Sequence, residues 1–269
     1  MMNALLAAAI ATATPAVDAV QQPLTEDASP AMFVVRDADT TVYIFGTFHA
    51  LDGKADWFKD RVRTAFDASD ELVLETVIPE GPVRAKREAF RGQPLPVTPS
   101  ASFLATTRMA ISAGKSQGMQ VNNGADNVLR HIAEAEGKPV SGLETLELQL
   151  SMFNRMPATK PAPEPKAGQP VDEGSSIGDL SKAMADMQAA WKHGDQGVFV
   201  HMLGQLEQAA PDTYRMMFTE RNARWADWIA GRMQTPGTVF VAVGAGHLAG
   251  KDSLLVQLAE RGIPSQRVN

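Results

Sequence analysis

Two short motifs, each a glycine, two further residues and a histidine, stand far apart in this chain. They are GTFH at residues 46–49 and GAGH at residues 244–247, and each follows an apolar run rich in β-forming residues. Imidazole transfers protons near neutral pH and binds divalent metals. A single histidine after a strand is more often a hydrogen-bonded structural residue, but the repeated context indicates that His49 and His247 serve one site.

Two glutamates stand at the ends of two more predicted strands. Glu75 ends the run at residues 71–75, and Glu144 follows the run at residues 139–143. In open α/β sheets, ligands bind beyond the carboxyl ends of the strands, so four adjacent parallel strands would bring both glutamates and both histidines to one edge. A glutamate in such a place can also be an exposed side chain or a charge at a helix N-terminus.

These residue types are suitable ligands for a divalent metal ion. The chain contains no cysteine, so a metal must take nitrogen and oxygen ligands. Two histidines with one or two carboxylates suit Zn, Mn or Co and leave an open position for water. The sequence therefore predicts a metal held by His49, His247 and Glu144, with Glu75 as the catalytic carboxylate that orients or deprotonates the bound water.

Polar residues interrupt the apolar face of a predicted helix at residues 216–233. Phe218, Trp225 and Ile229 form an apolar stripe at helical spacing, and Arg221 and Asn222 lie on the same stripe. Buried polar groups cost free energy unless they are hydrogen-bonded, so a buried carboxylate, a ligand or a cavity is expected beside them. Arg221 either binds substrate and stabilises an oxyanion, or pairs with a glutamate and ties the helix to the sheet.

The pattern of elements favours an α/β fold with a mixed central β-sheet built from the N- and C-terminal parts, flanked by helices, with a largely helical middle. Residues 32–35 and 41–45 predict a β-hairpin, and residues 58–69 predict a helix with Asp56 placed to cap it. Residues 177–233 are strongly helix-forming, and residues 237–268 predict strand, helix and strand.

The domain organisation follows from composition along the chain. Residues 31–268 are expected to form one domain, with a surface insertion at residues 157–176, where five prolines fall among polar and small residues. Residues 1–19 resemble a signal peptide because residues 4–11 form a short apolar core, although the usual basic residues before it are missing; the alternative is a disordered alanine-rich tail. A periplasmic or secreted location is expected, without a transmembrane segment in the mature chain.

Charge excludes one class of partner. The chain of 269 residues has a formal net charge of −6 and no run of lysine and arginine, which argues against nucleic-acid binding. The expected partner is a peptide or a small-molecule substrate, and the sequence leaves the oligomeric state open.

Taken together, the motifs resemble the TraB/PrgY/GumN family, a relative of the Tiki-type metal-dependent peptidases. The resemblance rests on both glycine-histidine motifs, the LVLE segment ending at Glu75, the GLET segment around Glu144 and the ERN segment at residues 220–222, although Phe48 stands where an aliphatic residue is commoner. It implies that His49 and His247 are metal or catalytic residues, that Glu75 is their acidic partner, and that Arg221 and Asn222 line the site.

The sequence as a whole predicts an exported metal-dependent hydrolase, with peptide bonds as the expected substrate. One alternative is a non-catalytic protein that sequesters a signalling peptide or small ligand in the same pocket. Another is metal-free hydrolysis, in which a histidine acts as general base and a glutamate orients it. The same residues serve all three.

Overall fold

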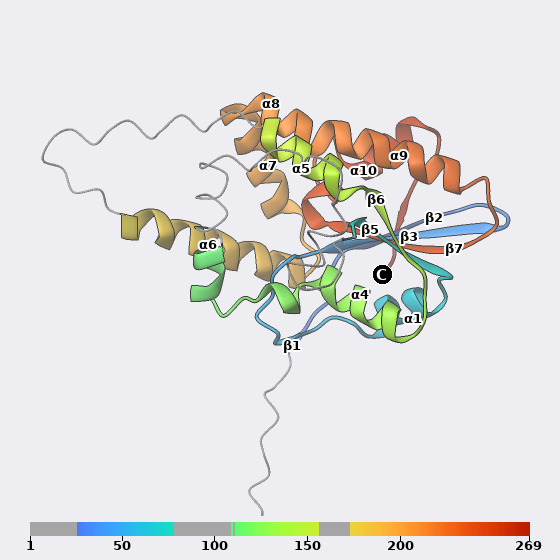
Figure 1. Cartoon of the computed structure of the whole chain (residues 1–269), viewed down its shortest axis with the longest axis horizontal. Coiled ribbons are helices and arrows are strands. Elements are labelled where there is room, and N and C mark those ends of the chain that lie inside the picture. The colour runs from blue at the N-terminus through green and yellow to red at the C-terminus, as the bar shows by residue number, and fades with distance from the viewer. Residues whose placement is uncertain (1–25, 78–108, 110, 156–172) are drawn as a thin grey trace, which may run out of the picture.

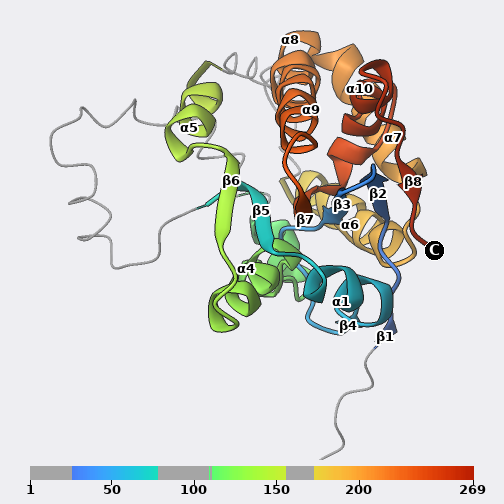
Figure 2. The ribbon, with the colours of Figure 1, turned by 90° about the vertical axis from the view of Figure 1, so that its right-hand side faces the viewer.

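The computed structural model describes residues 26–77, 109, 111–155 and 173–269 (Figure 1). Within these residues, six strands form one mixed sheet in the order β6-β5-β7-β3-β2-β8. Helices cover both faces of the sheet (Figure 2). The predicted α/β class and the mixed sheet are confirmed, with the addition that β6 comes from the middle of the chain.

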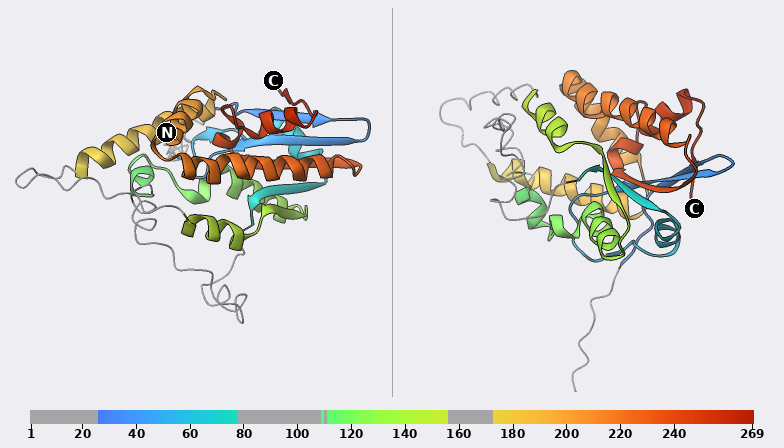
Figure 3. Two further views of the ribbon diagram at one scale, coloured as in Figure 1. Left: turned by 90° about the horizontal axis from the view of Figure 1, so that it is seen from above. Right: turned by 45° about the vertical axis from the view of Figure 1, so that its right-hand side comes forward.

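The predicted hairpin is formed by β2 (Met32–Arg36) and β3 (Thr40–Thr47), which pair antiparallel. Asp37 closes the turn, because its Oδ1 accepts hydrogen bonds from the backbone N–H groups of Asp39 at 3.2 Å and Thr40 at 2.8 Å. At the sheet edge, β8 (Gln266–Arg267) pairs antiparallel with β2. The hairpin turn lies at the opposite end of the molecule from the start of α6 (Figure 3).

The other strands are parallel, and this arrangement positions the site. β3 pairs with β7 (Gly237–Gly244), β7 with β5 (Glu71–Thr76), and β5 with β6 (Val140–Glu144). All four carboxyl ends therefore meet at one edge of the sheet. The register sets Thr47 beside Gly244, so the two glycine-histidine motifs leave the sheet as direct neighbours.

Alternating side chains of the central strands supply a separate core on each face. Phe45 and Phe240 belong to the core covered by α1, α4, α6 and α7, whereas Ile44 and Val241 belong to the core covered by α9 and α10. β7 is buried on both faces, as its continuous apolar run predicts for a central parallel strand. The strand ends at the site thus stand on a rigid base.

The helices that cover the sheet have the following bounds: α1 (Asp60–Asp67), α4 (Ala125–Ala135), α5 (Leu146–Arg155), α6 (Glu173–Lys192), α7 (Gly197–Ala209), α8 (Pro211–Tyr214), α9 (Glu220–Arg232) and α10 (Leu254–Glu260). Between α8 and α9 the chain makes a π-helical turn, η2 (Arg215–Thr219), so the predicted helix at residues 216–233 is not uniformly α-helical. In the described part of the chain, no helix is both long and apolar enough to cross a membrane.

The predicted cap of the first helix is wrong. Asp56 lies in β4 (Ala55–Asp56), which pairs with β1 (Glu26–Asp27), and the N-cap of α1 is Lys59, without a side-chain cap hydrogen bond. Strand pairing holds residues 55–56 extended, so the helix can begin only after them. The buried face predicted from Val62, Ala65 and Phe66 is confirmed.

Two predicted segments lie mainly outside the described residues. The signal-peptide prediction at residues 1–19 lies wholly outside them, as does the proline-rich segment up to residue 172. The last residues of the predicted insertion are helical, because α6 already begins at Glu173. The final proline of the segment is Pro170, so the chain beyond it is free to adopt a helix.

Candidate functional site

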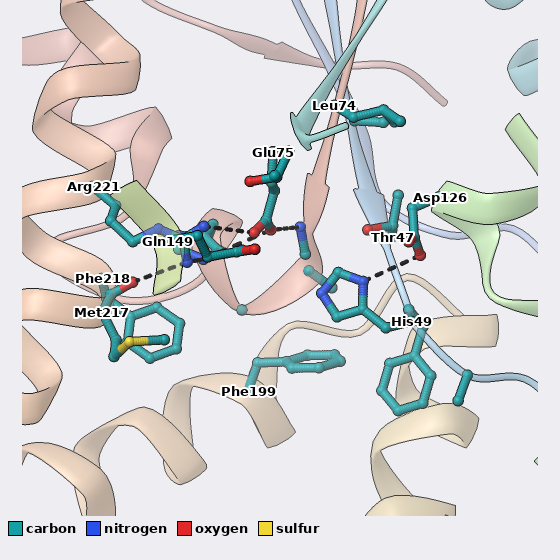
Figure 4. Close-up of a pocket in the computed structure, with 18 of the residues that line it drawn as sticks. Thr47, His49, Leu74, Glu75, Asp126, Gln149, Phe199, Met217, Phe218 and Arg221 are labelled. Carbon is teal, nitrogen blue, oxygen red and sulfur yellow. Dashed lines mark hydrogen bonds and ion pairs between the residues drawn. The ribbon is translucent and has the colours of Figure 1, made fainter. Parts of the chain in front are cut away.

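A pocket of about 630 Å³ opens at the carboxyl edge of the parallel strands. His49, Glu75, Arg221 and His247 line it, and they come from the ends of β3, β5 and β7 and from α9. Glu144 ends β6 beside them and is bonded to Arg221. Figure 4 shows Glu75, from β5, and His49, from the turn after β3, pointing toward one space, and β7 lies between these two strands in the sheet. The sequence-predicted residues therefore lie together.

Gly244 leaves the space in which these side chains meet. A Cβ atom on Gly244 would lie 3.1 Å from Oε1 of Glu75, 3.3 Å from Nε2 of His49 and 3.7 Å from Cδ2 of His247. The glycine is needed for room and not for an unusual φ, since its φ of −54° is available to any residue. His49 and His247 thus face the same small volume although they lie at opposite ends of the chain.

Glu75 is held as a carboxylate. Its Oε1 accepts a hydrogen bond from the backbone N–H of Gly244 at 2.6 Å, and its Oε2 accepts one from Nη2 of Arg221 at 2.7 Å. Burial raises the pKa of Glu75, but its electrostatic interactions with His247, Arg221 and His49 and the Gly244 hydrogen bond outweigh this effect and lower the pKa to about 2. Glu75 is therefore ionised at neutral pH.

His247 is buried and neutral. Asn222 donates from Nδ2 to the backbone oxygen of Asp252 at 2.7 Å, which turns its Oδ1 toward Nδ1 of His247, also at 2.7 Å. An amide oxygen only accepts, so Nδ1 carries the hydrogen and Nε2 accepts from Nη1 of Arg221 at 3.2 Å. Burial, opposed by Glu75 and assisted by Arg221 and His49, lowers the pKa of His247 to about 3.

Arg221 ties α9 to two strands of the sheet. Its Nε donates to both oxygens of Glu144, at 3.1 and 3.0 Å, while Nη2 holds Glu75. The side chains of Arg221 and Glu144 are only 4% and 1% exposed. Arg224 also donates to Glu144 Oε1, at 3.2 Å. Of the two predicted roles for Arg221, pairing with a glutamate is observed directly, and Arg221 also reaches the pocket wall.

Asp126 is a site residue that the sequence analysis missed. Its Oδ1 lies 3.1 Å from Nδ1 of His49, in the first turn of α4 (Figure 4). Partial loss of water around the ring lowers the pKa of His49, but the hydrogen bond and charge of Asp126, with the charge of Glu75, raise it to about 9. His49 is therefore protonated at neutral pH, and its side chain remains 62% exposed, so a substrate can reach it.

Gly124 allows α4 to approach His49. A Cβ on Gly124 would lie 2.3 Å from the backbone oxygen of His49, which is closer than atoms can pack. Ala125 donates its N–H to the backbone oxygen of Phe48 at 3.0 Å, which fixes the helix start against the motif. A sequence signal existed, since a glycine followed closely by an aspartate is typical of a helix start.

The donors do not fit the predicted metal ion in this arrangement. Both oxygens of Glu144 accept hydrogen bonds from arginines, and Nε2 of His247 faces the cationic Arg221. Among the described residues, no group of three or more His, Asp or Glu is placed to hold a metal ion. Catalytic zinc sites use three protein ligands, whereas two donor atoms, Oε1 of Glu75 and Nε2 of His49, are found among the three atoms nearest the space above Gly244.

The side of the pocket facing these polar groups is apolar. We call this side the apolar wall; it consists of Phe48, Met184, Phe199, Met202, Met217 and Phe218. Phe218 also packs against His247, with 4.9 Å between ring centroids, and Trp225 packs against it at 4.4 Å. The aromatic contacts hold the His247 ring in place and keep water from it.

Comparison with known proteins gives one match. The sequence profile of the TraB/PrgY/gumN family matches residues 31–91 and 83–267, which together cover most of the chain and include all the site residues described above. No curated protein and no solved structure matches the chain.

Proposed function

This chain belongs to the TraB/PrgY/gumN family, and from that membership and the site geometry we propose that it is a hydrolase that cleaves peptide bonds. One observation carries the proposal. Nε2 of His49 and Oε1 of Glu75 meet over Gly244 at the floor of an accessible pocket, and their charge states are opposite. A water molecule and a carbonyl group held between them would meet a base and an acid together.

Glu75 is the proposed general base. It is ionised at neutral pH, and Arg221 and the Gly244 N–H hold its two oxygens in place. As water attacks the carbonyl carbon, Glu75 takes one proton from it. The low pKa makes Glu75 a weak base in the resting site, so correct positioning must supply much of the rate.

His49 is the proposed general acid. Its raised pKa keeps a proton on the ring at neutral pH, and Asp126 holds Nδ1, which leaves Nε2 to donate. The proton on Nε2 first stabilises the oxyanion and then passes to the leaving nitrogen as the C–N bond breaks. Glu75 afterwards releases its proton to solvent, and His49 takes one up. These roles reverse the metal-free alternative, in which a histidine was the base.

Arg221, Asn222 and His247 are proposed to position the reacting groups. Arg221 orients Glu75 directly, and His247 supports Arg221 by accepting its hydrogen bond. Asn222 fixes the tautomer of His247. The proposed mechanism uses no metal ion, because Glu144 and His247, two of the three predicted metal ligands, are bonded to Arg221.

The test is a peptide-library cleavage assay read by mass spectrometry, with Glu75→Gln and His49→Gln compared with wild type. General acid and base groups each contribute roughly 10²–10⁴ in rate, so we expect each variant to lose at least about 100-fold in kcat. His201→Gln is the matched control, since His201 lies on α7, is exposed and contacts Gln205. Full turnover by Glu75→Gln would overturn the proposed mechanism.

A binding protein is the second candidate, and the ion-pair network favours it. Arg221 bonds to Glu75, Glu144 and His247, an arrangement that stabilises a rigid pocket without any chemistry. In the same library assay, a binder retains peptides and releases them uncut, whereas a hydrolase yields fragments. The assay therefore separates the two functions.

The proposal includes export, which rests on the apolar segment at residues 4–11 and on small residues before Thr14 and Val20. We expect the mature chain to begin after Ala13 or Ala19 and to be recovered outside the cytoplasm. Mass spectrometry of the native protein after cell fractionation measures both. A cytosolic protein that still carries Met1 or Met2 would contradict export.

A further inference from the structure

The apolar wall faces the reacting groups across the pocket, and its residues come mainly from elements that contribute none of the proposed catalytic side chains. Met184 lies on α6, Phe199 and Met202 lie on α7, and Met217 and Phe218 lie on η2. Figure 4 shows Phe199, Met217 and Phe218 on the side of the pocket opposite Glu75. A substrate whose carbonyl reaches His49 must therefore lay a neighbouring group against this wall.

The charges that line the pocket are paired with one another. Asp126 bonds to His49, and Arg221 bonds to Glu75. A charged substrate group placed against the apolar wall would lose its water without gaining a partner there, so its binding is strongly disfavoured. Burial of an uncharged apolar group against this wall would instead be favourable, because its apolar surface leaves water.

The residues of the apolar wall also determine which shapes of substrate side chain the pocket can accept. Met184 and Met202 are half-buried and have unbranched side chains with several rotatable bonds, which adapt to linear, branched and aromatic groups. Phe199 is buried and provides a more rigid part of the wall. The volume of about 630 Å³ is in the range of pockets that enclose a drug-sized ligand.

We propose that Met184, Phe199 and Met202 form a specificity subsite for a large uncharged side chain, such as that of Leu, Met or Phe, in the residue next to the cleaved bond. Cleavage of the neighbouring bond rests on the proposed function, but the preference of the pocket for a large uncharged side chain does not. Binding to the wall requires only the pocket, so it can be measured in a protein that does not turn over.

The first experiment measures cleavage of two short alanine-based peptides that differ only in a central Leu or Glu. We expect wild-type kcat/KM to be about 100-fold higher for the Leu peptide, because the apolar wall offers no partner to the charge of the Glu side chain. Met202→Lys should reduce this ratio at least tenfold, because the new ammonium group pairs with the Glu side chain. Val200→Lys is the matched control, since Val200 lies on the same helix but is 46% exposed and outside the pocket.

The second experiment measures binding of the same two peptides to the Glu75→Gln variant by titration calorimetry. Tighter binding of the Leu peptide, lost in the double variant with Met202→Lys, supports the subsite even if no peptide is ever cut. If wild-type protein cuts both peptides equally well, the subsite is overturned while hydrolysis stands. If the Glu75→Gln variant binds both peptides equally well, the subsite is overturned whether or not the protein is a hydrolase. Should Met202→Lys fail to fold by circular dichroism, Met184→Lys replaces it, since Met184 is half-buried.

Discussion

The charge on His49 depends on one carboxylate from a different element. Asp126, together with the charge of Glu75, raises the pKa of His49 from its ordinary 6.5 to about 9, so the ring holds its proton through the neutral range. If His49 donates that proton, activity is present below about pH 9 and falls as the pH rises through the pKa of the ring. Glu75, the proposed base, has a pKa of about 2, so the loss of activity on the acid side of the pH profile is expected only at much lower pH.

Asp126→Asn should therefore move the alkaline limb of the kcat/KM profile to lower pH, by about one unit or more, because the contribution that raised the pKa is gone. The measurement is the pH dependence of kcat/KM between pH 5 and 10. Asp186→Asn, which removes an exposed partner of Lys182, is the control and should leave the limb in place. An unmoved limb in Asp126→Asn would mean that His49 is not the acid.

Arg221 gives a stability prediction at the same scale. Its removal leaves the buried carboxylates Glu75 and Glu144 without their shared cation. Arg221→Ala should lower the free energy of unfolding by about 3–5 kcal/mol, the range for breaking a buried ion pair on one side. Urea unfolding at pH 7 measures the loss.

Arg215→Ala is the control for that measurement, because Arg215 is 63% exposed and its partners are surface carboxylates. We expect it to change the free energy of unfolding by less than about 1 kcal/mol. If Arg221→Ala also lowers the free energy of unfolding by less than about 1 kcal/mol, Arg224 alone neutralises Glu144 and the bonds of Arg221 contribute little to stability.

At the scale of elements, the site depends on the docking of α4 against the turn after β3. Gly124 packs closely against the backbone oxygen of His49 because it has no Cβ atom, and the first turn of α4, which follows it, carries Asp126. A substitution at Gly124 should therefore act on catalysis by moving a helix, although Gly124 itself holds no reactive group.

We expect Gly124→Ala to shift α4, separate Asp126 from His49 and lower kcat/KM at least tenfold. Gly204→Ala is the matched control, since Gly204 lies within α7, a methyl group added there would meet nothing within 4 Å, and alanine favours the helix. Thermal unfolding checks that both variants fold. Wild-type activity in Gly124→Ala would show that the contact between α4 and the turn is dispensable.

At the scale of the whole molecule, the order of the sheet explains why four distant segments share one site. β3, β5, β6 and β7 are adjacent and parallel, so their carboxyl ends form a single edge. The helices then decide which strand-end groups remain open: α9 covers Glu144 with two arginines, whereas His49 and Glu75 stay at the pocket.

The donor arrangement predicts the outcome of metal removal. Because Glu144 and His247 are bonded to Arg221 and catalytic zinc sites use three protein ligands, we expect dialysis of the purified protein against a chelator to leave peptide cleavage unchanged within about twofold. Elemental analysis before and after dialysis measures the metal content. The metal site predicted from sequence would be established by three results together. The protein would contain stoichiometric Zn, Mn or Co, dialysis would remove this metal and the activity together, and His49→Gln would not retain the metal.

The sequence by itself determined the elements and the groups at their ends. Apolar runs in β-forming residues marked the strands, and the paired glycine-histidine motifs marked where they leave the sheet, because these signals are local in the chain. The inward direction of Arg221 and Asn222 followed from helical spacing, and both are buried. The cap at Asp56 failed because a strand pairing with residues 26–27 overrode a local preference.

Only the tertiary structure decided the partners of each side chain, and with them the chemistry. The bonds from His49 to Asp126 and from Arg221 to Glu144 each join residues 77 positions apart. No local pattern specifies such a pair, because it depends on how α4 and α9 dock on the sheet. Since burial and neighbouring charge set each pKa, His49 became the protonated group and His247 the neutral one, although both follow a strand in the same motif.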